Sequence, residues 1–526
     1  MNHIKSLYIE GFKKFIRLYV EFNQEMNIIV GENEAGKSTI LEAIKIALNQ
    51  QYKNADKSVL RDLFNIENVK RFKDNPSIQT LPSILIELEL DIDPKNKNAS
   101  SFYGEMHSQR KSQREKYGIK FECRYDDSID TDIERVIVNG NIPYEYYSMT
   151  WTTFANQSYQ AIKRPFNFLS IDTSDQISTS SFNYYNKSLF ASKYDETLRM
   201  KVKNKFRSRL EDTFNELGLP AINSNRVFGV DAKKIILENV ISVFENSIAL
   251  ENRGKGIENL IKTQIALDKS NHVDVISIEE PENHLSISTL NKMLGEIADK
   301  RSQSQIILTT HNSLIASRLN LKNVLWITKD GSQSLNTINE DDAKFFVKAE
   351  NNSFLHLLLS EKAFLVEGNT EFLLLPKFYK EETGKTLEQD GISIISCGGI
   401  SYKRYLSIIK ETDKKIAIIT DNDKKQKNID NASEFNSTHS NQQIFMGKDV
   451  KDWTWEVCFF NLNQEALSEL IKVEDDAEYL FNDKDYGQVL GKMLNNKTEV
   501  AYSMLMSSTR FNLPDYVKDA IKWIRK

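Results

Sequence analysis

The stretch Gly31-Glu-Asn-Glu-Ala-Gly36-Lys37-Ser38-Thr39 decides the fold of the first half of the chain. It follows the compact apolar segment Met26–Val30, which is typical of a buried strand, and precedes Ile40–Leu48, whose apolar residues recur at helical spacing. The spacing G-x-x-x-x-G-K-S/T between a strand and a helix predicts a phosphate-binding loop. Its glycines let backbone N–H groups face phosphate oxygens, and the helix N-terminus adds a positive end.

This loop predicts a nucleotide site with defined roles. Lys37 would reach the β- and γ-phosphates, and the Ser38 hydroxyl would ligate Mg²⁺. The alternative, a glycine-rich turn before an ordinary helix, is disfavoured because the flanking strand and helix are both present. The residues expected to contact the nucleotide are Asn33, Gly36, Lys37, Ser38 and Thr39.

Two later strands add groups that a nucleotide hydrolase needs. The first, Asp274–Ile278, ends in Glu279 and Glu280, where such an enzyme holds its metal ion and polarises water. The second, beginning at Gln305, ends at His311. A histidine alone is more often a structural hydrogen-bonding residue, but one strand after Glu280 it is a credible sensor of the γ-phosphate.

Composition bounds the class of protein. The 526 residues are 40% hydrophobic and 27% charged, which is typical of a globular protein with several domains. A net charge of −5 excludes a general polycation, so a nucleic acid would be met by local basic patches or metal-bridged phosphates. The three cysteines are too few for a disulfide framework and match no zinc site, which favours the reducing cytoplasm. Because no apolar run reaches the length of a bilayer span, we expect no membrane partner.

The order of the parts predicts an α/β fold. Strands and helices alternate from Val230 onward and again from Ala363, which favours parallel sheets. We expect Ile133–Val138 to pair as a strand with Ile119–Tyr125, and the polar stretch Asn422–Asn441 to be a mobile loop. The expected domains are the first part of an ATPase (1–150), a helical insertion (151–225), the second part of the ATPase (226–345) and a C-terminal α/β domain ending in helices (346–526).

A second group of carboxylates follows the strands of the last domain. Glu367 ends an apolar strand, Glu371 lies in the first turn of the next helix, and Asp421 and Asp423 follow a third strand. Because the ends of parallel strands share one sheet edge, these four groups can converge. They could not stay ionised together away from water without divalent cations, and hard oxygen ligands select Mg²⁺ or Mn²⁺. Each carboxylate taken singly could instead be a solvated strand end.

The first half of the chain resembles the ATPase head of the ABC superfamily, and Ile9-Glu-Gly-Phe-Lys-Lys-Phe resembles the branch with SMC and RecF proteins. In that resemblance Glu280 is the catalytic glutamate, and Glu279 stands where many relatives have aspartate. Gly254 and Gly256 could form the signature loop that caps a partner's nucleotide, although a plain loop is the alternative. The resemblance therefore implies a homodimer or a higher homo-oligomer. The stretch Lys187–Leu217 is a candidate dimerisation element, or a helical segment packed within its own chain.

The second half resembles a Toprim domain, because Glu-Gly-x-x-Glu, a glycine turn and Asp-x-Asp occur in order. An ABC-type ATPase followed by Toprim is the arrangement of the overcoming-lysogenisation-defect (OLD) nucleases, which the segments Val366–Pro376 and Ile278–Leu285 resemble closely. This resemblance implies a further metal ligand, Glu456. It also implies that Lys497 neutralises the scissile phosphate, although an exposed lysine is the alternative.

These expectations combine into an ATP-binding DNA endonuclease that hydrolyses phosphodiesters with two Mg²⁺ or Mn²⁺ ions. The resemblance suggests anti-phage defence, with a helicase or a reverse transcriptase and its DNA product as a possible partner. The competing hypothesis is a RecF- or SMC-like ATP-gated DNA clamp that does not cut. Basic stretches at Lys424–Lys427 and Arg110–Lys120 could hold a DNA backbone, but a solvated charged loop is the more common reading.

Overall fold

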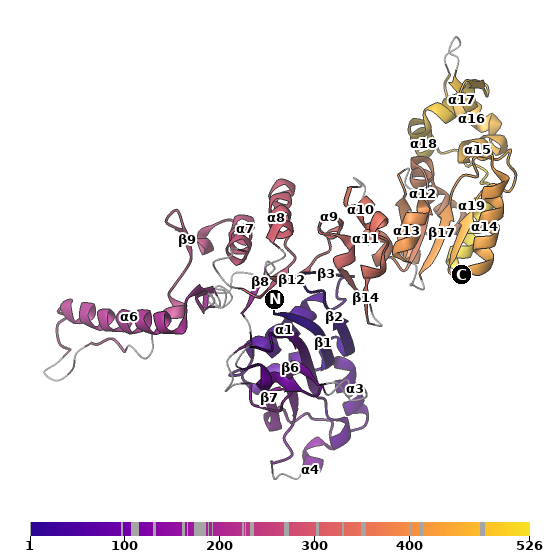
Figure 1. Cartoon of the computed structure of the whole chain (residues 1–526). Coiled ribbons are helices and arrows are strands. Elements are labelled where there is room, and N and C mark those ends of the chain that lie inside the picture. The colour runs from indigo at the N-terminus through magenta and orange to yellow at the C-terminus, as the bar shows by residue number, and fades with distance from the viewer. Residues whose placement is uncertain are drawn as a thin grey trace. The chain divides into compact units, whose positions relative to one another are not determined.

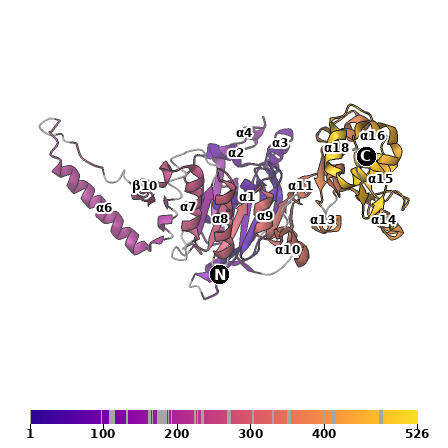
Figure 2. The ribbon, with the colours of Figure 1, turned by 90° about the horizontal axis from the view of Figure 1, so that it is seen from above.

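The computed structural model divides the chain into two compact units, Met1–Thr337 and Ile338–Lys526. Figures 1 and 2 show the ribbon from two directions. No helix in the described part of the chain is both long and apolar enough to cross a membrane. The structure describes residues 2–95, 98–106, 115–129, 133–159, 164–165, 167–172, 186–187, 189–191, 193–222, 226, 228–231, 236–267, 273–300, 304–328, 331–348, 354–398, 401–409, 414–473 and 479–526.

The first unit contains two large sheets. One is antiparallel, with the order β2-β1-β4-β6-β5 and β7 also paired with β6. These strands are β1 (His3–Phe12), β2 (Phe15–Glu21), β4 (Ile84–Asp91), β5 (Tyr103–Gly104), β6 (Lys116–Tyr125) and β7 (Tyr147–Thr153). The other has the order β14-β13-β3-β12-β11-β8 and is parallel except for β14. Its strands are β3 (Met26–Gly31), β8 (Phe168–Asp172), β11 (Val275–Glu279), β12 (Gln305–Thr309), β13 (Val324–Ile327) and β14 (Ser332–Ser334).

Helix α1 (Lys37–Asn49) packs against both sheets of this unit. Eight of its thirteen residues are buried, among them Ile40, Ile44 and Leu48, so the apolar spacing seen in the sequence faces the core. The indole of Trp151 on β7 donates a hydrogen bond of 2.8 Å to the carbonyl of Ile46, which ties the helix to the antiparallel sheet. The loop that precedes α1 is thereby fixed against a rigid helix.

After α1, the first unit has the short helices α2 (Leu60–Leu63), α3 (Ile66–Asp74) and α4 (Ile133–Ile137), and further helices late in its sequence. Helices α7 (Lys255–Ala266) and α8 (Ile287–Lys300) contact each other and lie side by side in both views. Helix α9 (Ser313–Arg318) follows β12, and α6 (Glu196–Glu216) extends away from the sheets. No residue of α6 is buried, whereas Leu189, which belongs to the same candidate stretch Lys187–Leu217, is buried, so dimerisation and packing within the chain both stay predictions for this stretch.

The second unit is built on a four-stranded parallel sheet with the order β16-β15-β17-β18. The strands are β15 (Lys362–Val366), β16 (Ile392–Ser396), β17 (Lys415–Ile419) and β18 (Gln442–Phe445). Helices α12 (Asn369–Thr383), α13 (Tyr402–Ile408) and α14 (Gln426–Thr438) connect them, and α15 (Trp455–Leu462), α17 (Gln488–Asn495), α18 (Lys497–Met506) and α19 (Asp515–Arg525) follow. Its core gathers aromatic residues such as Phe378, Trp455 and Phe459.

Three sequence expectations differ from this structure. The predicted strand Ile133–Val138 is wrong, because Ile133–Ile137 is the helix α4, whose buried Ile133 and Ile137 are four residues apart and share one helix face. The predicted loop Asn422–Asn441 is wrong over Gln426–Thr438, which forms the helix α14. Only Ala432 of this helix is buried, so its sequence shows no clear apolar period. The stretch 151–225, expected to be a helical insertion, begins with the end of β7 and with β8, and both are sheet strands.

Candidate functional site

The phosphate-binding loop bends sharply into α1. Gly36 precedes the helix with a φ of +98°, and a Cβ there would lie 2.4 Å from the Phe15 ring, so this position requires glycine. The loop borders a cavity of about 430 Å³, within the ~300–1,000 Å³ typical of ligand pockets. Ten residues line the cavity, and they include all five expected nucleotide contacts: Lys13, Lys14, Asn33, Glu34, Gly36, Lys37, Ser38, Thr39, Glu280 and His311.

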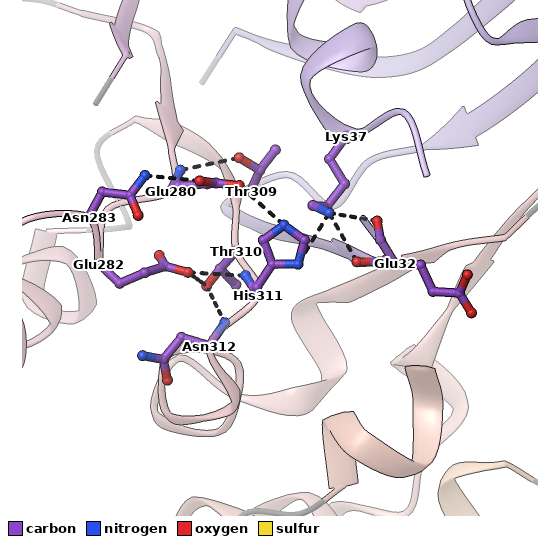
Figure 3. A network of polar contacts seen from close by, with 10 residues as sticks. Glu32, Lys37, Glu280, Glu282, Asn283, Thr309, Thr310, His311 and Asn312 are labelled. Atoms are coloured by element: carbon purple, nitrogen blue, oxygen red, sulfur yellow. Dashed lines mark hydrogen bonds and ion pairs between the residues drawn. The ribbon is translucent and has the colours of Figure 1, made fainter. Parts of the chain in front are cut away.

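The topology of the parallel sheet brings Lys37, Glu280 and His311 together (Figure 3). The Lys37 ammonium donates hydrogen bonds of 3.0 Å to the carbonyls of Gly31 and Glu32 and lies 3.4 Å from Nδ1 of His311. Nε2 of His311 is 3.2 Å from Oε1 of Glu280. The sequence predicts these three residues to share one site, and the structure brings them into a continuous chain of polar contacts.

Burial lowers the pKa of two of these groups. It lowers the pKa of Lys37, and the carboxylates of Glu280 and Glu282 only partly offset this effect. Burial, followed by the charge of Lys37, also lowers the pKa of His311 below its usual 6.5. His311 is therefore neutral at pH 7, and one of its ring nitrogens can accept a hydrogen bond.

Two positioning residues beside His311 were not found from the sequence. The carboxylate of Glu282 accepts hydrogen bonds from the Thr310 hydroxyl at 2.6 Å and from the His311 backbone N–H at 3.0 Å. The Asn283 side-chain amide donates to Oε2 of Glu280 at 2.9 Å. Both residues follow directly after Glu279-Glu280-Pro281 in the sequence, and this position is the only feature that could have indicated their role.

Three further expected residues lie outside this cavity. Glu279 is buried at the end of β11, in register with Thr309 of β12. Gly254 caps the N-terminus of α7, and a Cβ on Gly256 would lie 2.2 Å from the His284 carbonyl oxygen. Close packing within the chain therefore already accounts for glycine at position 256.

The second cluster of polar groups forms at the carboxyl edge of the Toprim-like sheet. Glu367 follows β15 and accepts hydrogen bonds from the Thr420 hydroxyl and from the Asp421 backbone N–H, the latter at 3.2 Å. Asp421 accepts from the Trp455 backbone N–H at 3.0 Å and from the Thr454 hydroxyl at 2.7 Å. Glu367, Asp421 and Asp423 line one cavity, as expected for ends of neighbouring parallel strands.

Glu371 and Glu456 lie deeper, each only 3–4% exposed. Glu456 accepts hydrogen bonds from the hydroxyls of Thr454 at 2.6 Å and Thr370 at 3.1 Å, and its Oε2 is 2.9 Å from the Lys497 ammonium. The Lys497 ammonium is therefore paired with the acidic cluster, although its side chain is 42% exposed. Asp423, by contrast, is exposed, and its backbone N–H donates to the Trp453 carbonyl at 3.2 Å.

The cluster holds more carboxylates than the local donors can neutralise. Burial, followed by the charge of Asp421, raises the pKa of Glu371 to about 8. Burial also raises the pKa of Asp421 to about 7, with Glu456 and Glu367 adding to it against the Thr454 hydrogen bond. Burial alone would lower the pKa of Lys497, but Glu456 and its neighbours outweigh it and the pKa is raised.

The Thr454 hydroxyl shows the same imbalance in geometry. It contacts both Asp421 and Glu456, but it has one proton and can donate to only one carboxylate at a time. If it donates to Asp421, Glu456 keeps the Lys497 ammonium and the Thr370 hydroxyl; if it donates to Glu456, Asp421 keeps only the Trp455 backbone N–H. An all-oxygen donor set of this kind fits Mg²⁺ or Mn²⁺. Within the described residues, however, no three His, Cys, Asp or Glu side chains are already arranged around a metal position.

Asn422 is a further residue that sequence analysis missed. It is fully buried, and its amide donates to the carbonyls of Gly447, Asp449 and Asp452 at 2.9–3.0 Å. Its own Oδ1 accepts from the Lys424 backbone N–H at 3.0 Å, which shapes the turn that carries Asp423. The position of Asn422 between two aspartates is the only feature of the sequence that could have indicated this role.

Of the two basic stretches, the structure describes all of Lys424–Lys427 and part of Arg110–Lys120. The Lys424 ammonium lies 4.0 Å from the centroid of the Trp453 ring and donates to the Tyr486 hydroxyl at 2.8 Å, so it is held against aromatic residues rather than fully solvated. In the other stretch, residues 110–114 lie outside the described residues.

Comparisons with known proteins agree with both halves of this picture. The family model for the overcoming lysogenization defect protein-like TOPRIM domain matches residues 358–423, and the AAA ATPase domain model matches residues 3–218. The Old nuclease of Escherichia phage P2 is 30% identical over 163 residues, which is 28% of each chain. The RecF DNA replication and repair protein of Clostridioides difficile is 37% identical over 68 residues, which is 12% of this chain and 18% of the relative.

The matches thus span less than a third of either relative. Among solved structures, the C-terminal region of the Burkholderia pseudomallei OLD protein is 19% identical and covers 32% of this chain and 97% of that one. The TM-score of this match is 0.25. The family models confirm the predicted fold class, an ATPase domain followed by a Toprim domain.

Proposed function

We propose that this protein, an ATPase–Toprim protein of the OLD family, is a DNA endonuclease that depends on divalent metal ions and binds and hydrolyses ATP. The observation that supports it best is a cluster of four carboxylates at the carboxyl edge of the parallel sheet in the second unit: Glu367, Glu371, Asp421 and Glu456. The Lys497 ammonium is paired with this cluster. A DNA clamp without cleavage has no use for such a set of carboxylates.

The carboxylates would hold Mg²⁺ or Mn²⁺, two ions in the proposal, with Glu367, Glu371, Asp421, Asp423 and Glu456 as ligands. Such ions, when bound, lower the pKa of an attacking water and stabilise the negative charge on the cleaved phosphate. The chain itself orients the ligands: Thr454 and the Trp455 backbone N–H fix Asp421, and the Thr420 hydroxyl fixes Glu367. Lys497 would offset charge on the scissile phosphate.

In the ATPase unit the proposed roles follow the polar contacts. Lys37 would exchange its bonds to the Gly31 and Glu32 carbonyls for phosphate oxygens, and Ser38 and Glu279 would bind the nucleotide's Mg²⁺. Glu280 would accept a proton from water, and neutral His311 would sense the γ-phosphate. Gly254 and Gly256 would face the nucleotide of a partner chain in a homodimer.

The biological setting belongs to the same proposal. The Old nuclease relative comes from a phage, which suggests a role in conflict between phages or in anti-phage defence. A reverse transcriptase with its DNA product, or a helicase, would be the partner in such a system. The three cysteines are buried and free, which suits the cytoplasm.

The deciding experiment incubates supercoiled plasmid with the full chain and Mg²⁺ or Mn²⁺, with and without ATP. Wild type should nick or linearise the plasmid, and Glu367→Gln should lose at least about 10²-fold in rate, because removal of a metal-site carboxylate disables the ion. Glu434→Gln, an exposed carboxylate on α14 that does not line the cavity, is the matched control. Cutting that survives Glu367→Gln, or no cutting with either ion, would favour the ATP-gated clamp.

A further inference from the structure

A cavity of about 850 Å³ lies on one face of the Toprim sheet and begins at the catalytic carboxylates. Its floor is apolar and includes Leu365 on β15 and Ile444 on β18, which the strand registers place on the same face of the sheet. Its walls come from α13 and α14, which contribute among others Tyr402, Lys403, Asn428, Asn431, Phe435 and His439. The proposed chemistry of cleavage uses only the mouth of this cavity, at Glu367, Asp421 and Asp423.

The side chain of Gln442 is the unexplained group in this cavity. Gln442, Ile444 and Met446 alternate in sequence and point to the same face, and all three line the cavity. Gln442 is only 8% exposed, and its side-chain amide makes no hydrogen bond to any residue that the structure describes. The amide lines the cavity, so it can form hydrogen bonds with a ligand that enters there, on a face that is otherwise largely apolar.

The position of Gln442 sets the length of that ligand. Gln442 pairs in register with Ile416, five residues before Asp421, which places it roughly 16 Å from the carboxylates at ~3.3 Å per residue. The cavity volume lies within the ~300–1,000 Å³ that accommodates a small ligand, and a DNA duplex is far too wide to enter. A single strand of one or a few nucleotides would fit this space.

The lining of the cavity matches the parts of an unpaired nucleotide. The apolar floor suits the faces of bases, and the rings of Phe435 and His439, stacked with centroids 4.0 Å apart, form an aromatic wall. Glutamine and asparagine amides such as those of Gln442 and Asn431 are suited to base edges, which are accessible only when a base is unpaired. Lys403 is exposed beside the cavity and could contact a phosphate.

We propose that this cavity binds an unpaired nucleotide of the DNA strand that is cut, with Gln442 as a residue that contacts the base. The protein then prefers DNA with single-stranded nucleotides next to the cleavage position, such as an overhang, a flap or a gap, over fully paired DNA. The inference rests on the proposed function for the identity of the ligand, but binding can be measured without cleavage.

The test measures binding of the full chain to fluorescently labelled DNA by anisotropy, with Ca²⁺ in place of Mg²⁺ to suppress cutting. A duplex with a single-stranded overhang, the same duplex with blunt ends, and free dAMP as competitor are compared. Wild type should bind the overhang more tightly than the blunt duplex. Gln442→Leu should lower affinity for the overhang about three- to tenfold, the loss expected for one buried hydrogen bond, and leave blunt-duplex affinity unchanged.

Gln443→Leu is the matched control, because it changes the same residue type one position along β18, on the opposite face of the sheet. Gln442→Leu should not lower the melting temperature, since it replaces an amide that faces the cavity by an apolar group of similar size. Asn431→Ala, at an exposed position on the wall, tests the same cavity without a change in the core.

Each outcome separates the inference from the proposed function. Equal wild-type affinity for both duplexes, or an equal loss in Gln442→Leu and Gln443→Leu, would overturn the inference even if Glu367-dependent cutting is observed. Binding of dAMP that depends on Gln442, without an overhang preference, would identify a free nucleotide as the ligand and also overturn it. A Gln442-dependent overhang preference without any cutting would support the inference and reject the endonuclease.

Discussion

At the scale of single residues, the protonation of two carboxyl groups in the acidic cluster controls how the stability of the protein depends on pH. Glu371 and Asp421 have pKa values of about 8 and about 7, because burial and neighbouring carboxylates disfavour their charged forms. Their folded-state pKa values are higher than the unfolded ones, so between about pH 4 and 8 the folded state binds more protons than the unfolded state. The metal-free protein should therefore become less stable as pH rises through this window.

The same shift predicts the pH dependence of metal binding. Because the ligands must lose protons to bind a cation, the affinity for Mn²⁺ should rise between pH 6 and 8 and then level off. Titration calorimetry at pH 7 in two buffers with different ionisation enthalpies should show the release of about one proton per chain. In Glu371→Gln the release should shrink, and a proton release that is zero in wild type would contradict the prediction.

Glu280 carries the corresponding prediction for the ATPase unit. Its carboxylate contacts His311 and Asn283 and lines the nucleotide cavity, so Glu280→Gln should reduce ATP hydrolysis by about 10²-fold or more. ATP binding should persist, since Lys37 and the loop are unchanged. Phosphate release and fluorescent-nucleotide binding are the two measurements, with Glu211→Gln on the exposed helix α6 as control. Loss of binding and hydrolysis together would indicate a structural role instead.

At the scale of elements, the junction between β15 and α12 shows why a glycine is needed. A Cβ on Gly368 would lie 2.8 Å from Oε2 of Glu371, and the next closest atoms belong to the same carboxylate. Gly368→Ala should therefore fold normally but displace Glu371, and calorimetry should show Mn²⁺ affinity lowered about tenfold. Gly295→Ala on α8 has open space around the added methyl group and should change neither metal affinity nor folding. Unchanged Mn²⁺ affinity in Gly368→Ala would remove Glu371 from the ligand set.

At the scale of the whole molecule, the two units have separate hydrophobic cores. The core of the first gathers residues from Ile4 to Ile327, and that of the second gathers residues from Phe364 to Ile524. Lys37→Met should therefore abolish ATP binding without changing Mn²⁺ affinity at the Toprim site. Nucleotide fluorescence and calorimetry on the full chain check the two halves of this prediction. A parallel loss of Mn²⁺ binding would show that the nucleotide loop supports the fold of both units.

We propose helix α6 as the element that joins two chains. Leu198 and Val202 are four residues apart on one helix face, and they are 42% and 39% exposed. If α6 mediates dimerisation, Leu198→Arg with Val202→Arg should shift the mass measured by light scattering toward the monomer. Lys205→Ala on the same helix should leave the mass unchanged. A dimer that survives the double substitution would exclude α6 as the contact.

The sequence by itself determined the order of the parts and most of the chemistry. The G-x-x-x-x-G-K-S spacing between β3 and α1, and carboxylates placed directly after β11, β15 and β17, are local patterns, and parallel strands bring their ends to one edge whatever the loops between them do. Lys37, Glu280 and His311 could be assigned to one site for that reason. Apolar periodicity likewise located α1, the strands β3, β11 and β12 of the first unit, and β15, β16 and β17 of the second, whereas β8, β13, β14 and β18 were not predicted.

Only the tertiary structure decided which neighbours those groups have. Thr454 and Lys497 approach Glu456 across the fold, Glu282 holds the backbone of His311, and Gln442 is left without a partner inside a cavity. The helices α4 and α14 escaped prediction because each buries too few apolar residues to show a clear period. Burial, hydrogen-bond partners and pKa values depend on residues distant in sequence, and a local pattern contains no information about them.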